Sequence, residues 1–568
     1  MGPVEGDLPL ITFAFRCRAT ALALLALLLG AAPATAITLP ADFVAEPLPF
    51  TFDVPTSIAF LPDGGLLVAE KGGIVYLVRG ASRYSFWVHE EEVLNADDSG
   101  LLSIAVDPNF AVNRYVYFLY TVDPDSNGVE LDNHDDAFGR LTRYRVSAGD
   151  PNRVDESTRT VLIGRTWREG FPCGSGAHTI ADLAWGRDGT LLVAAGEGSH
   201  HDITDAGGHD PGLFAPGRTD PAEDIGAFRA QDPASLAGKV LRVDPATGLG
   251  LPSNPYFDGD PASNRSRVWA YGLRNPFRIT VEPGTGSTDP AAGDPGTLFI
   301  ADVGWATWEE ISVADGPGRN FGWPCFEGPA VNPDYQGATP SHHDCTTPGT
   351  PENPAMPTTP IASWHHWIDA LSAPTPGESI VLAGGVFQTA AGWPAPWRGA
   401  YFAGDYGLGW IGAVTIDGQN QATEVVPFAT EADGPVDFIV DPATGDLAYI
   451  ALATESVVRI RYTGAPPPPP PPPVPPAALA LGPPRPNPSR GSVTLALETP
   501  TPARVDFAIH DVVGRQVWRE GDRDAPAGRI DLAWPGVLEN GGRAPAGVYL
   551  AVVRVGAERL TRRFVLMP

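Results

Sequence analysis

Lysine is nearly absent from this sequence: Lys71 and Lys239 are the only two among 568 residues. Acidic side chains outnumber basic ones by 67 to 38, and the formal net charge is −29. A surface of this sign repels polyanions, so nucleic acid and anionic lipid are excluded as principal partners, whereas cation binding is favoured.

Cysteine is scarce too, with four residues, and no C-x-x-C-H haem-attachment site is present. A G-x-G-x-x-G fingerprint between a strand and a helix is also missing, which excludes the usual nicotinamide site. Cys17 lies in an N-terminal segment that we expect to be removed. Of the other three, Cys325 and Cys345 share a loop-rich segment and are expected to pair in an oxidising compartment; the alternative is three buried thiols, Cys173 included.

Long apolar runs are missing after the first 36 residues. The one clear run, residues 19–32, follows Arg16 and Arg18 and precedes the small residues Ala34-Thr35-Ala36. It is too short to span a bilayer and has the order of a secretory signal. We therefore expect residues 1–36 to be a signal peptide and the rest to be exported, with no transmembrane segment.

Sustained helical periodicity is absent, and an apolar strand–turn–strand unit recurs instead. Residues 55–78 (PTSIAFLPDGGLLVAEKGGIVYLV) are typical, and six such units occur within residues 37–464. Radial repetition of four-stranded sheets accounts for this spacing, so the sequence predicts an all-β, six-bladed β-propeller. The proline run in residues 465–478 predicts a stiff linker to residues 479–568, which read as a small immunoglobulin-like β-sandwich.

One predicted hairpin carries a histidine and a glutamate at its two outer ends. His178 precedes the predicted strand 180–185, and Glu197 follows the predicted strand 190–195. A hairpin brings its ends together, and a carboxylate beside an imidazole fixes the tautomer and raises the basicity of the ring. The pair predicts a general base; the alternative is a histidine that only caps a strand edge.

Five further segments follow one another along residues 37–464: LLSIAVDPNF (101–110), QDPASLAGKVLRVD (231–244), AYGLRNP (270–276), IADVGWATWEEI (300–311) and NFGWPCFEG (320–328). Together with His178, and in this order, they resemble the soluble glucose/sorbosone dehydrogenase family. The resemblance implies a six-bladed propeller that oxidises aldose sugars with pyrroloquinoline quinone (PQQ) and calcium. The family also includes eukaryotic relatives that bind protein partners.

The resemblance assigns catalytic roles. His178 matches the base that takes the proton from the C1 hydroxyl of the sugar as hydride passes to PQQ. Glu197 stands where the family usually has an aspartate that orients this histidine. Arg274 and Asn275 match the pair over the quinone, where a guanidinium stabilises developing negative charge.

The resemblance also suggests how cofactors are held. Gly304 and Trp305 match the positions whose backbone carbonyls bind calcium. Glu309 and Glu310 follow in the same loop and would add charge near the metal; the alternative is a solvated acidic loop, which we favour for Glu310. PQQ carries three carboxylates, and the cations expected to meet them are Arg398 and Arg459, with Arg278 as a further candidate. The sequence departs from the family after His178, where the family's run usually contains two glycines and this chain has the bulkier Thr179-Ile180-Ala181-Asp182.

Three loops outside these motifs have weaker signals. The acidic loop 97–99 and residues 132–136 are expected to be solvated. The histidines and aspartates of residues 200–210 read as a polar loop or a cation site. Trp364–Trp367 offers either a sugar-binding surface or packing between sheets.

The C-terminal module resembles the sorting domain of the type IX secretion system. The segments that carry the resemblance are Pro486-Asn487-Pro488, residues 509–515 (IHDVVGR) and residues 545–549 (PAGVY). This implies type IX machinery as a partner and a location outside, or on the surface of, a Gram-negative-type bacterium, with the periplasm as second choice. The alternative is an ordinary accessory domain.

Together these features favour an exported quinoprotein that oxidises the C1 hydroxyl of an aldose sugar or oligosaccharide and passes electrons to an external acceptor. The main alternative is a non-catalytic propeller that binds glycan or protein partners at the cell surface. A calcium-stabilised lactone hydrolase is a third hypothesis.

Overall fold

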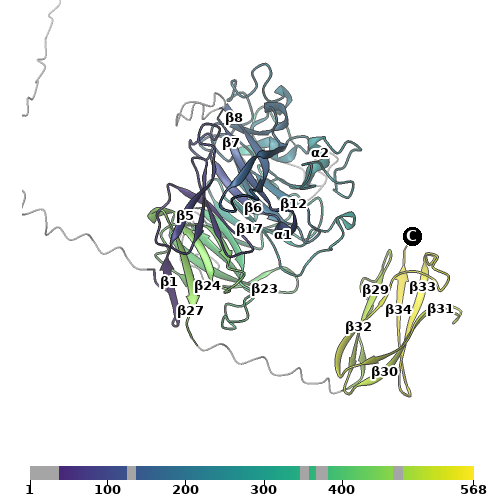
Figure 1. Ribbon diagram of the computed structural model, residues 1–568. Coiled ribbons are helices and arrows are strands. Elements are labelled where there is room, and N and C mark those ends of the chain that lie inside the picture. The colour runs from purple at the N-terminus through teal and green to yellow at the C-terminus, as the bar shows by residue number, and fades with distance from the viewer. Residues whose placement is uncertain are drawn as a thin grey trace, which may run out of the picture. The chain divides into compact units, whose positions relative to one another are not determined.

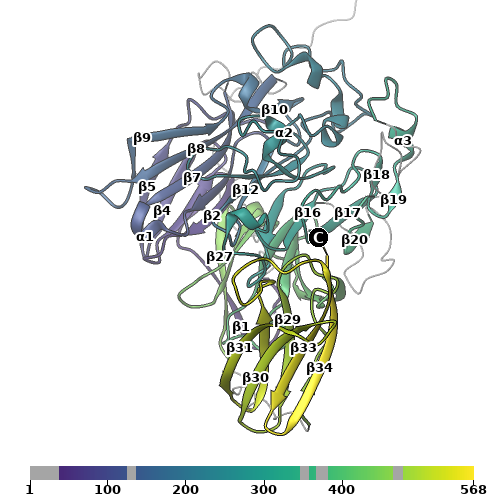
Figure 2. The same ribbon diagram turned by 90° about the vertical axis from the view of Figure 1, so that its right-hand side faces the viewer.

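The computed structural model describes residues 37–123, 136–343, 345, 357–365, 381–464 and 478–567 (Figures 1 and 2). The predicted signal peptide, most of the proline linker, His366, Trp367 and nearly all of the acidic segment 132–136 lie outside these residues. The chain divides into two compact units between Pro467 and Pro468. No helix among the described residues is long and apolar enough to cross a membrane.

The first unit is built from six antiparallel sheets of four or five strands, as far as the described residues show. In each of the first three sheets the strand order follows the chain, and β9 adds a fifth strand to the second sheet by pairing with β8. These sheets contain β2 (Pro55–Phe60), β3 (Leu66–Glu70), β4 (Ile74–Arg79) and β5 (Ser82–Val88); β6 (Leu101–Val106), β7 (Tyr115–Val122), β8 (Asp136–Val146), β9 (Val154–Ile163) and β10 (Phe171–Gly174); and β11 (Ile180–Trp185), β12 (Leu191–Ala195), β13 (Lys239–Val243) and β14 (Val268–Tyr271).

The next three sheets repeat this plan, and the last one joins the two ends of the unit. Its outer strand is β1 from the start of the described chain, which pairs antiparallel with β27 from Phe43↔Tyr462 to Pro47↔Val458. These sheets contain β15 (Arg278–Val281), β16 (Leu298–Asp302), β17 (Trp308–Ala314) and β20 (Ala362–His365); β21 (Leu382–Phe387), β22 (Tyr401–Asp405), β23 (Trp410–Ile416) and β24 (Ala422–Ala429); and β25 (Pro435–Val440), β26 (Leu447–Ala451), β27 (Ser456–Tyr462) and β1 (Phe43–Pro47).

The helical elements of the described chain are short and lie in the connections between strands. The remaining two strands of this unit form a small ribbon of their own. These elements are α1 (Phe110–Asn113), α2 (Asn264–Arg267), α3 (Pro333–Gln336), η1 (Trp167–Glu169), η2 (Pro221–Glu223), η3 (Gly226–Gln231), η4 (Pro290–Ala292), η5 (Leu452–Thr454), β18 (Phe326–Glu327) and β19 (Ala330–Val331).

Strand and turn chemistry explain why these segments pair. The second strands β3 and β12 are wholly buried, as expected for strands covered on both faces. The turn between β11 and β12 uses Asp188, whose Oδ1 accepts from the backbone N–H of Thr190 at 3.0 Å, and Gly189 at φ +76°. Glycine reaches that conformation without steric cost. The prediction of an all-β chain is thus confirmed.

The first strands of the sheets contact one another in chain order, and β25 contacts β2. Asp182 on β11 accepts from Ser103 Oγ on β6 at 2.8 Å and from Ile279 N on β15 at 3.0 Å. Arg278 on β15 donates to Thr56 O on β2 at 2.5 Å, and its Nε lies 3.3 Å from Asp437 Oδ1 on β25. Arg278 thus reaches from the fourth sheet to the first and sixth sheets, so it lies where the first strands converge.

The second unit consists of two antiparallel sheets that share one apolar core. Trp534 is fully buried there and donates from Nε1 to Val537 O at 2.8 Å. Alternation along β29 buries Leu495 and Leu497, as one-sided burial requires. The strands are β28 (Ala480–Leu481), β29 (Val493–Thr499) and β32 (Gly528–Trp534) in one sheet, and β31 (Gln516–Ala525), β30 (Ala503–Asp511), β33 (Gly547–Val555) and β34 (Glu558–Leu566) in the other.

Candidate functional site

His178 lies in the loop just before β11, in a left-handed backbone conformation with φ +48°. Asp98 holds this loop: its Oδ2 accepts from His178 N at 3.1 Å and its backbone O accepts from Thr179 Oγ1 at 3.1 Å. Gly196 packs so closely that a Cβ there would lie 2.3 Å from His178 O. The acidic loop 97–99 therefore does more than interact with solvent, because one of its carboxylates fixes the histidine backbone.

Glu197 follows β12, and its Oε1 lies 2.8 Å from His178 Nδ1. The same oxygen accepts from Ser199 Oγ at 2.7 Å, and the carboxylate is 1% exposed. A carboxylate can only accept, so Nδ1 carries a proton, and in the neutral imidazole Nε2 then has the free lone pair. Glu197 Oε2 is buried without a hydrogen-bond partner in the described chain. The structure thus brings together the two residues that the hairpin predicted, in the geometry of a general base.

Arg274 lies in the loop before β15 and joins this pair through the backbone, since its O accepts from Glu197 N at 2.8 Å. Its guanidinium is buried, lies 5.5 Å from the ring centre of Trp323, and donates from one terminal nitrogen to Val303 O at 3.0 Å and Gly304 O at 2.5 Å. Its Nε has no hydrogen-bond partner among the described residues. One N–H of this buried cation therefore has no partner within the described chain, in a residue whose backbone is bonded to that of Glu197.

Asp302 fixes the backbone that presents Arg274 and Asn275. Its two carboxylate oxygens accept from Arg274 N at 3.0 Å and from Asn275 N at 2.6 Å. Burial raises the pKa of Asp302 to about 7. Burial, together with the charge of Asp302, also raises the pKa of Glu310 well above its usual value. Both carboxyl groups line a small cavity with Arg274 and Gly304.

The loop of Gly304 and Trp305 is tied down by two glutamates. Glu327 Oε1 accepts from the successive backbone N–H groups of residues 305–308 at 2.7–3.2 Å. Glu309 Oε1 accepts from Gly304 N at 3.3 Å. The described residues contain no group of three or more His, Cys, Asp or Glu side chains arranged for a metal ion. Calcium at this loop would therefore depend on backbone carbonyls, and that of Gly304 is shared with Arg274.

The other predicted cofactor cations lie away from this cluster. Arg459 on β27 pairs with Asp441 at 3.2 Å and Asp446 at 3.8 Å, in the turn that follows β25. Arg398 is exposed in the loop that follows β21. Arg398 and the partners of Arg459 therefore lie after the last residue of the first strand of a sheet. His178 and Arg274 lie before the first residue of such a strand. The structure does not bring Arg398 or Arg459 to the site, and their cofactor role stays a prediction.

Loops beyond the motifs complete the surroundings of the site. Trp305 Nε1 donates to His201 O at 2.6 Å, and the His201 ring centre lies 6.5 Å from that of His178. His200 Nε2 lies 3.4 Å from Asp210 Oδ1. The loop 198–210 therefore covers the site edge. Trp364 is buried on β20, and its ring centre lies 5.9 Å from that of Trp410. This contact favours packing between sheets as the role of this tryptophan.

Two buried cations were missed by reasoning from the sequence. Arg229 is wholly buried and donates to the backbone carbonyls of Glu197 and Gly198, while the ammonium of Lys239 donates to three carbonyls at 2.6–2.9 Å. A lone lysine in a chain that has almost none was the only available signal. The predicted pair Cys325–Cys345 forms a disulfide, with Cα atoms 5.0 Å apart, and Cys173 is a buried free thiol.

Comparison with known proteins gives a consistent result. A curated relative, the aldose sugar dehydrogenase YliI of Escherichia coli, is 25% identical over 50% of this chain and 62% of its own. The HIPL1 protein of Arabidopsis thaliana is 24% identical over 70% of this chain and 55% of its own. The chain thus spans less than two thirds of the length of these relatives.

Solved structures show the same fold. A glucose dehydrogenase structure from Thermus thermophilus has 22% identity and a TM-score of 0.50, covering 74% of this chain and 100% of that one. The model of one family, Glucose / Sorbosone dehydrogenase, matches residues 52–448. This match spans most of the chain and every residue of the cluster around His178, so the protein belongs to the glucose/sorbosone dehydrogenase family.

Proposed function

We propose that the protein is a sugar dehydrogenase in which His178 is the general base that removes the proton of the C1 hydroxyl of an aldose. The observation that carries this proposal is the 2.8 Å contact between His178 Nδ1 and the buried Glu197 carboxylate. The contact leaves Nε2 as an acceptor, and the negative charge stabilises the imidazolium formed by proton transfer.

The proposal includes the fold and the cofactor. The six sheets, whose first strands adjoin one another, are taken as the blades of a six-bladed propeller. PQQ would accept the hydride, and calcium would polarise it. Arg274 and Asn275 would hold the quinone, and the carbonyls of Gly304 and Trp305 would hold the calcium.

Two observations support a fit to these groups. The partnerless Arg274 Nε offers a donor to an anionic oxygen, as reduction of a quinone requires. The buried carboxyl groups of Asp302 and Glu310 line the same small cavity as Gly304 and provide the oxygen-rich surroundings that calcium prefers. Arg274 would stabilise negative charge, Glu197 would hold the histidine tautomer, and Asp98 would keep the imidazole in place.

Reconstitution of the purified chain tests this function. PQQ and calcium would be added, excess removed, and the absorbance of retained quinone recorded before and after aldoses are added. We expect calcium-dependent retention and sugar-driven bleaching, which His178→Ala abolishes without loss of PQQ. The control Glu223→Gln alters a half-buried glutamate on η2 that accepts from Ser235 Oγ at 2.7 Å and forms no hydrogen bond with His178 in the described chain, so this variant should bleach normally. Failure to retain PQQ would refute the proposal.

A second candidate is a non-catalytic propeller that binds a glycan or protein. Arg274 favours it in one respect, because its guanidinium already binds two backbone carbonyls. Relatives in the comparisons include the Hedgehog-interacting protein of Homo sapiens, 27% identical over 34% of this chain. Absence of PQQ retention with the fold intact would favour this candidate.

Export and surface location are also proposed. Residues 1–36 would be a signal peptide, and residues 479–568 an immunoglobulin-like sorting module for type IX secretion. Two features support a separate role for this module: it forms a compact unit, and it carries twelve arginines against nine carboxylates in an otherwise acidic chain. Fractionation of producing cells tests this, and a protein that reaches the surface equally well without residues 479–568 would refute it.

A further inference from the structure

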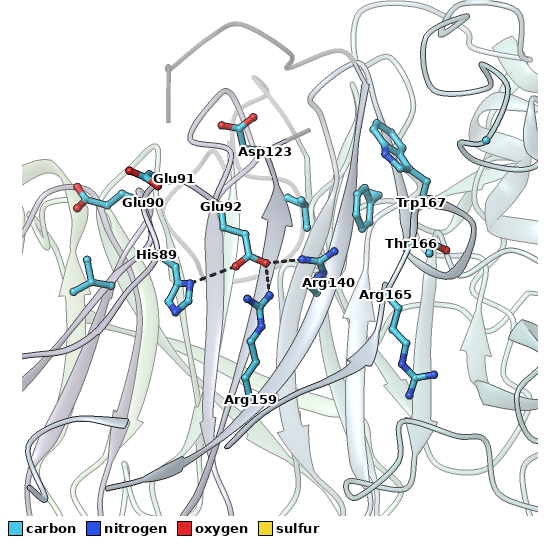
Figure 3. A pocket seen from close by; sticks show the side chains of 14 residues that line it. His89, Glu90, Glu91, Glu92, Asp123, Arg140, Arg159, Arg165, Thr166 and Trp167 are labelled. Carbon is cyan, nitrogen blue, oxygen red and sulfur yellow. Dashed lines mark hydrogen bonds and ion pairs between the residues drawn. The ribbon is translucent and has the colours of Figure 1, made fainter. Parts of the chain in front are cut away.

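A second cavity, of about 990 Å³, opens between the first two sheets and contains none of the residues assigned above (Figure 3). Its size matches that of ligand-binding pockets. The residues that line it come from the end of β5, from β7 and β8, from β9, and from the loop around η1. They are Val88, His89, Glu90, Glu91, Glu92, Val122, Asp123, Phe138, Arg140, Arg159, Arg165, Thr166, Trp167 and Gly217.

The floor of this cavity is a fixed network centred on Glu92. Its Oε1 accepts from Arg140 at 2.5 Å, from Tyr120 Oη at 2.7 Å and from Arg159, while Oε2 lies 3.3 Å from His89 Nδ1. Figure 3 shows these side chains converging on the carboxylate. Groups locked in this way lose little conformational freedom when a ligand binds. The floor is therefore preorganised.

The walls carry polar groups that the protein does not use. Glu91, Arg165 and Thr166 are exposed, and their side chains make no hydrogen bond or ion pair within the described chain. Trp167 is half-buried, with the Phe138 ring centre 5.0 Å from its own, and adds apolar surface beside these groups. The cavity thus combines free donors, free acceptors and an aromatic edge.

Charge of both signs narrows the ligand class. An anion would meet the carboxylates of Glu90, Glu91 and Glu92, and a cation would meet the guanidiniums of Arg140 and Arg165. A neutral hydroxyl group donates to a carboxylate and accepts from a guanidinium, so a polyhydroxylated ligand satisfies both. Its C–H faces would meet Trp167 and the neighbouring apolar side chains.

One loop connects this cavity to the candidate active site. The segment between β5 and β6 lines the cavity with residues 89–92 and then supplies Asp98, which holds the His178 backbone. Asp98 follows Glu92 by six positions, so their Cα atoms are no more than about 22 Å apart. Gly217, on the long connection that follows Glu197, also lines the cavity.

We propose that this cavity binds a neutral oligosaccharide, separately from the site at His178. Such an oligosaccharide would also be the substrate, bound in this cavity while its reducing end reaches His178. This consequence rests on the proposed function. Binding at the cavity itself does not depend on PQQ or calcium.

The test is calorimetric titration of the full chain, without PQQ, using maltotetraose, cellotetraose and tetragalacturonate. The pocket variant is Glu91→Gln with Arg165→Ala. The matched control is Arg168→Ala with Glu169→Gln, two exposed residues of η1 that do not line the cavity. Because each lost hydrogen bond weakens binding several-fold, we expect a neutral tetrasaccharide to bind the pocket variant at least about tenfold more weakly than the control.

Several outcomes would overturn the proposal: no binding of either neutral tetrasaccharide, binding of tetragalacturonate alone, or equal weakening in the control. His178→Ala should bind the tetrasaccharide normally, and loss of binding there would place the ligand at the other site and refute a separate pocket. Failure to retain PQQ would refute the proposed dehydrogenase function but would not affect the result on oligosaccharide binding.

Discussion

Replacement of Glu197 by glutamine removes one charge from the candidate active site and almost no volume. The wild-type carboxylate is 1% exposed and accepts a hydrogen bond from His178 Nδ1 at 2.8 Å. A hydrogen bond to a charged group stabilises by about 1.5–3 kcal/mol and a neutral one by about 0.5–1.5 kcal/mol. We therefore expect Glu197→Gln to cost about 1–2 kcal/mol in the transition state, which corresponds to a roughly 5- to 30-fold lower kcat.

The assay has two parts. Dye-linked turnover of the PQQ- and calcium-loaded enzyme gives kcat, and ¹⁵N NMR of labelled histidine reports which ring nitrogen of His178 carries the proton. The wild-type carboxylate admits only an Nδ1 proton, whereas the new amide can flip and donate, so the variant should show both tautomers. Glu223→Gln should change neither readout.

The result that would refute this reasoning is a folded Glu197→Gln enzyme with unchanged kcat and a single tautomer. Thermal unfolding separates this outcome from misfolding, because the native and variant transitions should both stay cooperative. An equal loss of kcat in Glu223→Gln would show that replacing a glutamate without a histidine contact has the same effect, which would remove the specific role of the contact between Glu197 and His178.

Other predictions concern stability, measured by urea unfolding. Asp188→Asn should cost about 3–5 kcal/mol, because it leaves the wholly buried Arg242, now 2.6 Å from Asp188, without a counter-charge. Cys345→Ser should cost about 3 kcal/mol, because the disulfide closes a loop of sequence separation 20. Burial alone would lower the pKa of His89, but pairing with Glu156 and Glu92 raises it to about 9. The pairing therefore stabilises fully below pH 6.5 and fades as pH rises through 9, so His89→Gln should cost about 1–2 kcal/mol at pH 6 and almost nothing at pH 10.

Each of these has a matched comparison. Asp63→Asn breaks an exposed pair with Arg79, 2.8 Å apart, and should cost no more than about 1 kcal/mol. Wild-type protein under reducing conditions should lose as much stability as Cys345→Ser does. A pH-independent cost of His89→Gln would contradict the ion-pair explanation.

The sequence predicted well where the signal is local. Alternating apolar residues and Asp-Gly turns gave the all-β class, and the hairpin 180–195 gave the meeting of His178 and Glu197. What escaped prediction depends on residues distant along the chain. Glu327 binds four N–H groups of a loop about twenty residues away, and Arg278 contacts Thr56 across 222 positions. Nothing in the local pattern around these side chains indicates their distant partners.

The role of Asp98 illustrates the same limit. An acidic loop usually faces water, so the sequence favoured solvation, whereas the fold places this carboxylate on the backbone of His178, 80 positions later. Arg274 was predicted near the reacting centre, but its bonds to Val303 and Gly304 depend on the exact path of that loop. The cavity beside Glu92 depends on two sheets and on loops that are distant along the chain, and it could not be predicted from sequence.

The pairing of β1 with β27 has a consequence for the time at which the protein can fold. Phe43 is among the first described residues to be synthesised, and its partner Tyr462 is among the last of the first unit. At about 5–20 residues per second, a ribosome needs roughly 20–80 s to make the chain between them. During that interval β1 has no partner strand, because β25, β26 and β27 have not yet been made, so the last sheet cannot form until nearly all of the first unit has been translated. A deletion confined to residues 43–47 would leave β27 without this partner for the whole life of the chain, and the edge of the last sheet would stay open to pairing with other strands.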